Sequence, residues 1–140
     1  MSAFPAIPAS FDRPRGGEVD VLVVAGEHSG DQHAAKVVAD LLAARPGLRI
    51  AAFGGPRLRA AGAQLLFDMT TFSAVGIVEI LSAYPFYRRL FNRMVDWTLQ
   101  WKPKVVVLVD YPGLNLRLAD ELRKAGLSRA GFGGTAVIQY

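Results

Sequence analysis

The pattern of apolar and polar positions divides the chain into short apolar runs and longer amphipathic segments. Residues 21–25 (VLVVA) and 105–109 (VVVLV) are apolar throughout, and glycine or aspartate follows each run. Unbroken valine and leucine runs of this length are typical of strands that are covered on both faces, as in a parallel sheet. We expect three further strands in the shorter apolar runs at residues 48–53, 65–67 and 136–140.

Helical patterns occupy the segments between the expected strands. After the first strand, Ser29 stands at an N-cap position with Gln32 three residues later, and residues 34–42 are good helix formers. A short helix between Pro56 and Gly62 follows the second strand. Later helices are expected to begin at residue 76 and to cover residues 85–101 and 114–125.

The helix at residues 85–101 has the clearest period. Its apolar side chains recur at intervals of three and four, so that one face carries Phe86, Leu90, Met94, Trp97 and Trp101. Such a stripe is most often core. The alternation of strands and helices along the whole chain predicts the α/β class, with a doubly wound, mainly parallel sheet of the Rossmann type.

Composition narrows the picture to one packed domain. A chain of 140 residues with 51% hydrophobic residues can bury a core, and the absence of cysteine excludes disulfide and thiol chemistry. No apolar run approaches the roughly 18 residues of a membrane span. The formal charge of +4 suggests an anionic partner. Residues 1–17, which contain three prolines and two glycines, are expected to be a flexible leader before a domain at residues 18–140.

The turn after the first strand matches none of the common nucleotide or hydrolase motifs. Its sequence, GEHSG at residues 26–30, is neither G-x-G-x-x-G nor a P-loop nor a G-x-S-x-G elbow. His28 and His33 lack metal-ligand spacing, so we interpret both as ordinary polar residues and expect no metal or cofactor. No nucleic-acid module accompanies the basic residues. A non-catalytic, flavodoxin-like module that binds a phosphate or a partner is therefore one functional alternative.

Four motifs in series point to an enzyme. They are AGEHSGD at residues 25–31, FGGP at 53–56, VGIVE at 75–79, and KP at 102–103 leading to DYPGLN at 110–115. In order and spacing they resemble the N-terminal part of the lipid-A-disaccharide synthase family. The resemblance implies the acceptor-side, Rossmann-like half of a GT-B glycosyltransferase. Its reaction joins UDP-2,3-diacylglucosamine to 2,3-diacylglucosamine 1-phosphate, forming the β-1,6 lipid A disaccharide and UDP.

Inverting glycosyl transfer needs one carboxylate base. Asp110, at the end of a buried strand, matches the aspartate of the family's D-x-P-x-x-N motif and is implied to be that base. The structural alternative is that Asp110 caps the following turn or helix. Asn115 would orient the acceptor or fix the loop. The resemblance implies these substrate-binding positions: Gly26, Glu27, Ser29, Gly30, Asp31, Gly54, Gly55, Gly76, Glu79 and Asn115.

Aromatic and cationic residues crowd the start of the helix at residues 85–101. A helix buries only one stripe, so we expect part of this surface to be an apolar patch rimmed by cations that faces an anionic membrane. The residues expected there are Phe86, Tyr87, Arg88, Arg89, Phe91 and Arg93. With the resemblance, this implies a cytoplasmic protein that is peripheral on the inner face of the cytoplasmic membrane of a Gram-negative type bacterium.

Overall fold

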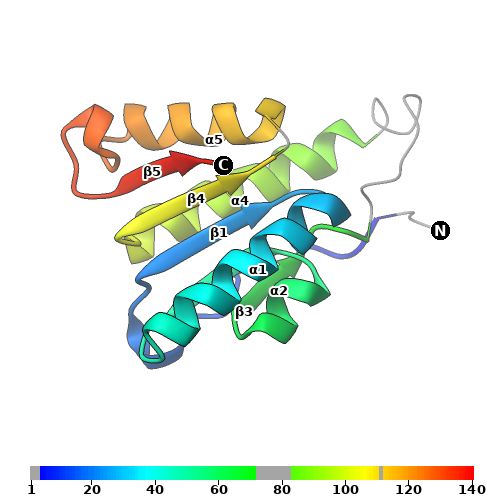
Figure 1. Ribbon diagram of the computed structural model, residues 1–140. Helices are drawn as coiled ribbons and strands as arrows, with labels where there is room; N and C mark the ends of the chain where they lie inside the picture. Colours follow the sequence, from blue (N-terminus) through cyan, green and yellow to red (C-terminus); the bar gives the residue numbers. More distant parts are fainter. Residues whose placement is uncertain (1–3, 72–82, 111) are drawn as a thin grey trace.

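The computed structural model describes residues 4–71, 83–110 and 112–140. Five strands form one sheet with all strands parallel, in the order β3-β2-β1-β4-β5 (Figure 1). The strands are β1 (Val21–Ala25), β2 (Ile50–Gly54), β3 (Gln64–Asp68), β4 (Val105–Val109) and β5 (Ala136–Gln139). This confirms the predicted α/β class with a Rossmann-like sheet.

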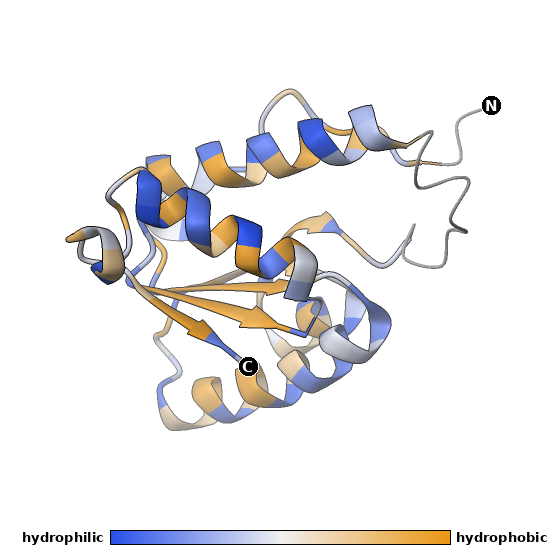
Figure 2. Ribbon diagram, turned by 90° about the horizontal axis from the view of Figure 1, so that it is seen from above, coloured by the Kyte–Doolittle hydropathy of each residue, from blue (hydrophilic) through white to orange (hydrophobic). Residues whose placement is uncertain are grey.

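Helices cover both faces of the sheet. The described helices are α1 (His28–Ala44), α2 (Pro56–Ala61), α4 (Tyr84–Trp101) and α5 (Pro112–Lys124), with short 3-10 turns η1 (Arg15–Gly17) and η2 (Arg129–Gly131). α1 and α2 pack on one face, and α4 and α5 pack on the other. Seen from above, the hydrophobic strands lie between these two helical layers (Figure 2). The expected helix start at residue 76 falls outside the described residues.

β1 and β4 are adjacent central strands, as the sequence predicts. They pair in register from Val21 with Val105 to Ala25 with Val109. Alternate side chains of β1 enter different cores: Leu22 and Val24 face α4 and α5, whereas the others face α1 and α2. Both faces of β1 are therefore buried, which explains its unbroken apolar sequence.

The start of α1 differs from the predicted capping box. α1 begins at His28, with Glu27 at the N-cap in an extended conformation and with no capping bond from its side chain. Ser29 therefore lies inside the first turn, and the prediction of Ser29 as N-cap with Gln32 closing a box is wrong. The reason is that the chain leaves β1 at Ala25 and needs only two residues to enter the helix.

The segment before β1 packs against the rest of the domain. Phe11 is buried, and its ring meets that of Phe53 edge-on at a centroid distance of 5.0 Å. The indole of Trp97 donates a hydrogen bond of 3.0 Å to the carbonyl of Asp12. Phe4 stacks on Phe86 at 4.9 Å. Residues 4–17 thus form a strap across α4, because two aromatic side chains and a carbonyl find partners there.

Candidate functional site

The carboxyl ends of β1 and β4 bring two motif regions together. β1 leads into the turn at residues 26–31, and β4 leads directly into Asp110. A methyl group at Gly30 would stand 3.6 Å from the carbonyl oxygen of Val109 and 3.7 Å from Oδ2 of Asp110. The first turn of α1 therefore lies against the Asp110 carboxylate, at the edge where open parallel sheets bind ligands.

Asp110 has a left-handed backbone conformation, and both its N–H and its carbonyl group are hydrogen-bonded. Its φ of 50° lies in the left-handed region, which few residues other than glycine adopt. Its N–H donates to the carbonyl of Tyr140 at 3.1 Å, and its own carbonyl accepts hydrogen bonds from the side chains of Asn115 and Gln139. Left-handed residues of this kind persist where surrounding contacts enforce them, and they cluster at functional sites.

Asn115 supplies much of that constraint. Its side chain is fully buried, and Nδ2 donates to the carbonyls of Val109, at 3.2 Å, and of Asp110. Its Oδ1 has no hydrogen-bond partner in the described part of the chain. These contacts fix the turn between β4 and α5. They also give a physical reason for the spacing of aspartate and asparagine in the D-x-P-x-x-N motif. From the first turn of α5, the side-chain amide of Asn115 reaches back to the carbonyls at the end of β4.

The Asp110 carboxylate itself is open to solvent. Its side chain is 44% exposed, and no backbone amide among the described residues donates to it. It lies beside His33, whose Nδ1 is 3.6 Å from Oδ2 and whose side chain is 55% exposed. Among the described residues no amide is capped by this carboxylate, and its role as a base stays a prediction.

Asp31 has a different position from Asp110. It is buried on α1, and Oδ1 accepts hydrogen bonds from the amides of Gly55 and Leu58 at 2.9 and 3.1 Å, while Oδ2 accepts one from Arg57 at 3.0 Å. Asp31 therefore caps the start of α2 across space. A side chain at Gly55 would come within 2.6 Å of the Asp31 carboxylate, so glycine permits this approach.

The other motif residues differ in accessibility. Gly26, Gly30, Gly54 and Gly55 are buried, Glu27 is half-buried, and Ser29 is exposed. Of the predicted substrate-binding positions at residues 26–31, Glu27 and Ser29 are the ones whose side chains reach the surface. Substrate contact at Asp31, Gly54 and Gly55 stays a prediction. Gly76 and Glu79 fall outside the described residues.

Sequence reasoning missed His33. Its lack of metal-ligand spacing predicts an ordinary polar residue. The signal that could have found it is its position three residues after Gly30, which puts both on one face of α1 toward the end of β4. Within the described ranges, no three His, Asp or Glu side chains gather as a metal site would require.

The predicted membrane-facing residues divide into two sets. Phe86 is buried beneath Phe4, and the Arg93 guanidinium donates to the carbonyls of Ile7, at 3.2 Å, and of Pro8. These two hold the strap and are not presented to a membrane in this structure. Phe91 and Tyr87 are half-buried, and the Arg117 guanidinium lies 5.3 Å from the centre of the Phe91 ring. Arg88 and Arg89 are exposed beside Tyr84, which is 57% exposed.

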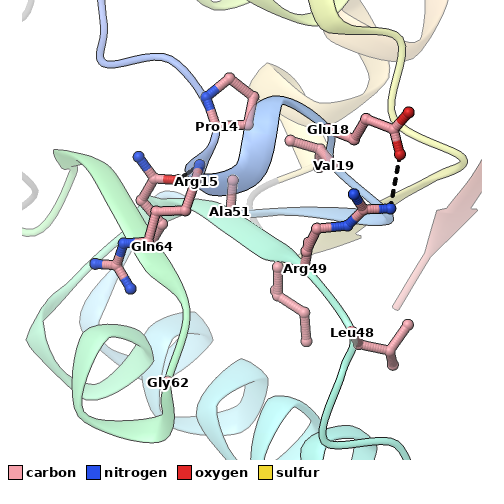
Figure 3. Close-up of a pocket in the computed structure, with 10 residues that line it drawn as sticks. Pro14, Arg15, Glu18, Val19, Leu48, Arg49, Ala51, Gly62 and Gln64 are labelled. Atoms are coloured by element: carbon pink, nitrogen blue, oxygen red, sulfur yellow. Dashed lines mark hydrogen bonds and ion pairs between the residues drawn. The ribbon is translucent and has the colours of Figure 1, made fainter.

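A pocket lies at the amino ends of β1 and β2, whereas Asp110 follows the carboxyl end of β4 (Figure 3). Arg49 forms an ion pair with Glu18 at 2.8 Å, and both side-chain groups of Gln64 bond to the backbone of the strap. Arg49 also binds Asp20. The backbone amide and the guanidinium of Arg49 both donate hydrogen bonds to the Asp20 carboxylate, and these bonds lower the pKa of Asp20 to about 2. These pairings satisfy the polar groups internally, so this pocket is part of the scaffold.

The five parallel strands in the order 3-2-1-4-5, with helices on both faces, define a Rossmann-like α/β domain. The family model described as lipid-A-disaccharide synthetase matches residues 21–130. The chain belongs to the lipid-A-disaccharide synthase family of glycosyltransferases.

Individual relatives agree with this assignment. The lipid-A-disaccharide synthase of Myxococcus xanthus is 46% identical over 107 residues, which are 76% of this chain and 28% of that protein. Lipid-A-disaccharide synthase 1 of Legionella pneumophila is 43% identical over 104 residues, covering 74% and 27%. The enzyme of Nitrosococcus oceani is 40% identical over 107 residues, covering 76% and 28%. The chain therefore spans little more than a quarter of the length of these relatives.

Proposed function

We propose that this chain is the N-terminal, acceptor-side part of a glycosyltransferase that makes the lipid A disaccharide. The reaction joins UDP-2,3-diacylglucosamine to 2,3-diacylglucosamine 1-phosphate through a β-1,6 bond and releases UDP. The observation that carries the proposal is the Asp110 carboxylate, which is open to solvent at the ligand-binding edge and lies within the D-x-P-x-x-N motif. Membership in the family supports it.

Asp110 acts as the general base in this proposal. Its carboxylate takes the proton of the acceptor 6-hydroxyl while that oxygen forms a bond to the anomeric carbon of the donor. The bond between the anomeric carbon and the diphosphate oxygen breaks on the opposite side, and its electron pair leaves with UDP. One base is sufficient because attack and departure occur in a single inverting step.

The first turn of α1 supports substrate binding in the same proposal. Its unpaired backbone amides point toward the carboxyl edge, and a helix N-terminus of this kind favours a phosphate group. Glu27 and Ser29 lie beside it, with side chains that can bind sugar hydroxyls. No metal or cofactor is needed for this assignment of roles.

We further infer that the protein works on the inner face of the cytoplasmic membrane as a peripheral, cytoplasmic protein. Both proposed substrates carry acyl chains that stay in a lipid surface. Tyr84, Arg88 and Arg89 form an exposed group on α4 with one aromatic ring and two cations, which suits an anionic headgroup layer. No helix in the described parts of the chain is long and apolar enough to cross a bilayer.

The test of the reaction is Asp110→Asn in the full-length protein. With both proposed substrates supplied, we expect turnover to fall by about two orders of magnitude or more, because the amide cannot accept the hydroxyl proton. Release of UDP and formation of the disaccharide are measured, with circular dichroism as the check on folding. The matched control is Asp40→Asn, an exposed aspartate on α1, which should behave like the parent. A parent protein that forms no disaccharide from these substrates contradicts the proposal.

A further inference from the structure

Asp110 is constrained in its backbone more than in its carboxylate. Hydrogen bonds to Tyr140, Asn115 and Gln139 fix its peptide groups, but none of them reaches the side chain. A carboxylate that is 44% exposed can rotate among several orientations. A base must instead be held in one orientation, because misplacement of the reacting atoms by about 1 Å can slow a reaction by about two orders of magnitude.

His33 is the side chain placed to hold it. Its Nδ1 faces Oδ2 of Asp110 at 3.6 Å, and it comes from α1, while Asp110 comes from the end of β4. Gly30, one turn earlier on the same face of α1, has no side chain between the helix and the carboxylate. The pair therefore joins the two elements that form the ligand-binding edge. At 3.6 Å the contact is longer than a direct hydrogen bond. Catalytic hydrogen bonds are often long in a protein without substrate and tighten in the complex.

We propose that His33 is a positioning residue for Asp110, an inference that rests on the proposed role of Asp110 as base. The imidazole donates its Nδ1–H to Oδ2 of Asp110. This fixes the carboxylate plane and leaves Oδ1 to accept the proton of the acceptor hydroxyl. His33 itself gains and loses no proton in this step. The arrangement is a carboxylate held by an imidazole donor on one oxygen, with the other oxygen free for the substrate.

Two substitutions at His33 separate this role from simple packing. His33→Leu keeps bulk but removes the donor, and we expect kcat to fall by about tenfold or more with little change in KM. His33→Asn keeps an N–H donor at the same number of bonds from the backbone as Nδ1, and its kcat should stay within about threefold of the parent. The matched control is Gln32→Leu, an exposed neighbour on α1, which should leave both constants unchanged. Equal losses in the Leu and Asn variants, or no loss in either, overturn the proposal.

A double-mutant cycle with Asp110→Asn tests whether His33 acts through Asp110. In the Asp110→Asn background, His33→Leu should lower the residual turnover by less than about twofold, since the group that it positions is gone. A full, independent loss there shows that His33 acts elsewhere. The two failures can be told apart. If only this inference fails, Asp110→Asn alone still lowers turnover by about two orders of magnitude. If the proposed function fails, Asp110→Asn has no such effect, and the positioning role is overturned as well.

Discussion

Asp31 is a buried residue of α1 whose carboxylate caps the start of α2. It accepts three backbone hydrogen bonds from α2, and two of them, from Gly55 and Leu58, are buried. α2 has only six residues and no capping bond from its own N-cap, so Asp31 replaces the local cap that a short helix needs. The acid of the SGD sequence thus stabilises the turn after β2.

Asp31→Ala should therefore destabilise the protein. The substitution leaves buried amides without an acceptor, and we expect the free energy of unfolding to fall by about 2 to 4 kcal/mol. Urea unfolding followed by circular dichroism measures the change, with Asp40→Ala, an exposed aspartate on the same helix, as the control. A loss no larger than that of the control means that solvent satisfies these amides and that Asp31 is free for another role.

The sequence predicts the place of Asp110 better than its surroundings. A polar residue directly after an unbroken apolar strand must lie at the carboxyl edge of a parallel sheet, so the position of Asp110 follows from the pattern. Its contact with His33 joins residues far apart in the chain: the spacing after Gly30 gives the face of α1 on which His33 lies, but it does not encode the contact itself. The cap that Asp31 provides to α2 is hidden for the same reason.

α4 combines three faces in one helix. The predicted apolar stripe is confirmed at Phe86, Leu90, Met94 and Trp97, which are buried against the sheet and the strap. A second face carries Arg93 and the indole of Trp97, which bind the carbonyls of the strap. The third face, with Arg88 and Arg89, points to solvent. Periodicity identifies the apolar face. The face that binds the strap can be distinguished from the exposed face only when the position of residues 4–17 is known.

The exposed face of α4 should bind anionic membranes. Replacing both Arg88 and Arg89 with glutamine in the full-length protein should weaken binding to phosphatidylglycerol vesicles by about tenfold or more, because each arginine near the surface contributes about 1 kcal/mol. The binding of the parent should also decline as salt rises. Co-sedimentation at low and high salt measures both effects.

The matched control for this surface is Arg57→Gln with Arg59→Gln. These exposed arginines lie on α2, which packs on the opposite face of the sheet from α4. Their replacement by glutamine changes the net charge by the same amount and leaves α4 unaltered. Equal weakening by the two double variants shows that net charge alone drives binding, and equal binding to neutral vesicles removes the membrane role assigned to α4.

At the scale of the whole molecule, the sheet could be predicted and the strap could not. The alternation of apolar runs and helices determines a doubly wound sheet, and both central strands have the predicted bounds. Residues 4–17 are held in place by single aromatic side chains such as Phe4 and Phe11. Isolated contacts of this kind leave no periodic pattern in the sequence, so the strap could not be predicted from periodicity. Docking of this kind depends on the surface that α4 and β2 create together.

The amino edge of the sheet is tied together by Asp20. Its carboxylate binds Arg49, which precedes β2, and Lys104, which precedes β4, at 3.3 and 3.2 Å. These contacts lower the pKa of Asp20 from 3.8 to about 2, chiefly through the Arg49 amide and guanidinium. A carboxyl whose pKa is lower in the folded state adds stability that is complete above its unfolded pKa and disappears as the pH falls toward its folded pKa.

Asp20→Asn should consequently cost about 2 kcal/mol of unfolding free energy at neutral pH, and the difference from the parent should shrink between about pH 4 and pH 2. Denaturant unfolding of both proteins at several pH values measures this difference. Asp96→Asn, at an exposed position on α4, provides the control. A difference that is the same at pH 2 and pH 7 would show that the carboxylate charge is not the source of the stability.

The strand order also matters while the chain is being made. β2 and β3 follow β1 directly, so one half of the sheet can pair as soon as residue 68 has left the ribosome. The other edge of β1 belongs to β4, where Val21 meets Val105. Until residues 105–109 emerge, that edge presents unpaired backbone groups flanked by apolar side chains, which is the kind of surface that aggregates. During that interval the open edge at residues 21–25 can pair with an edge strand of another chain.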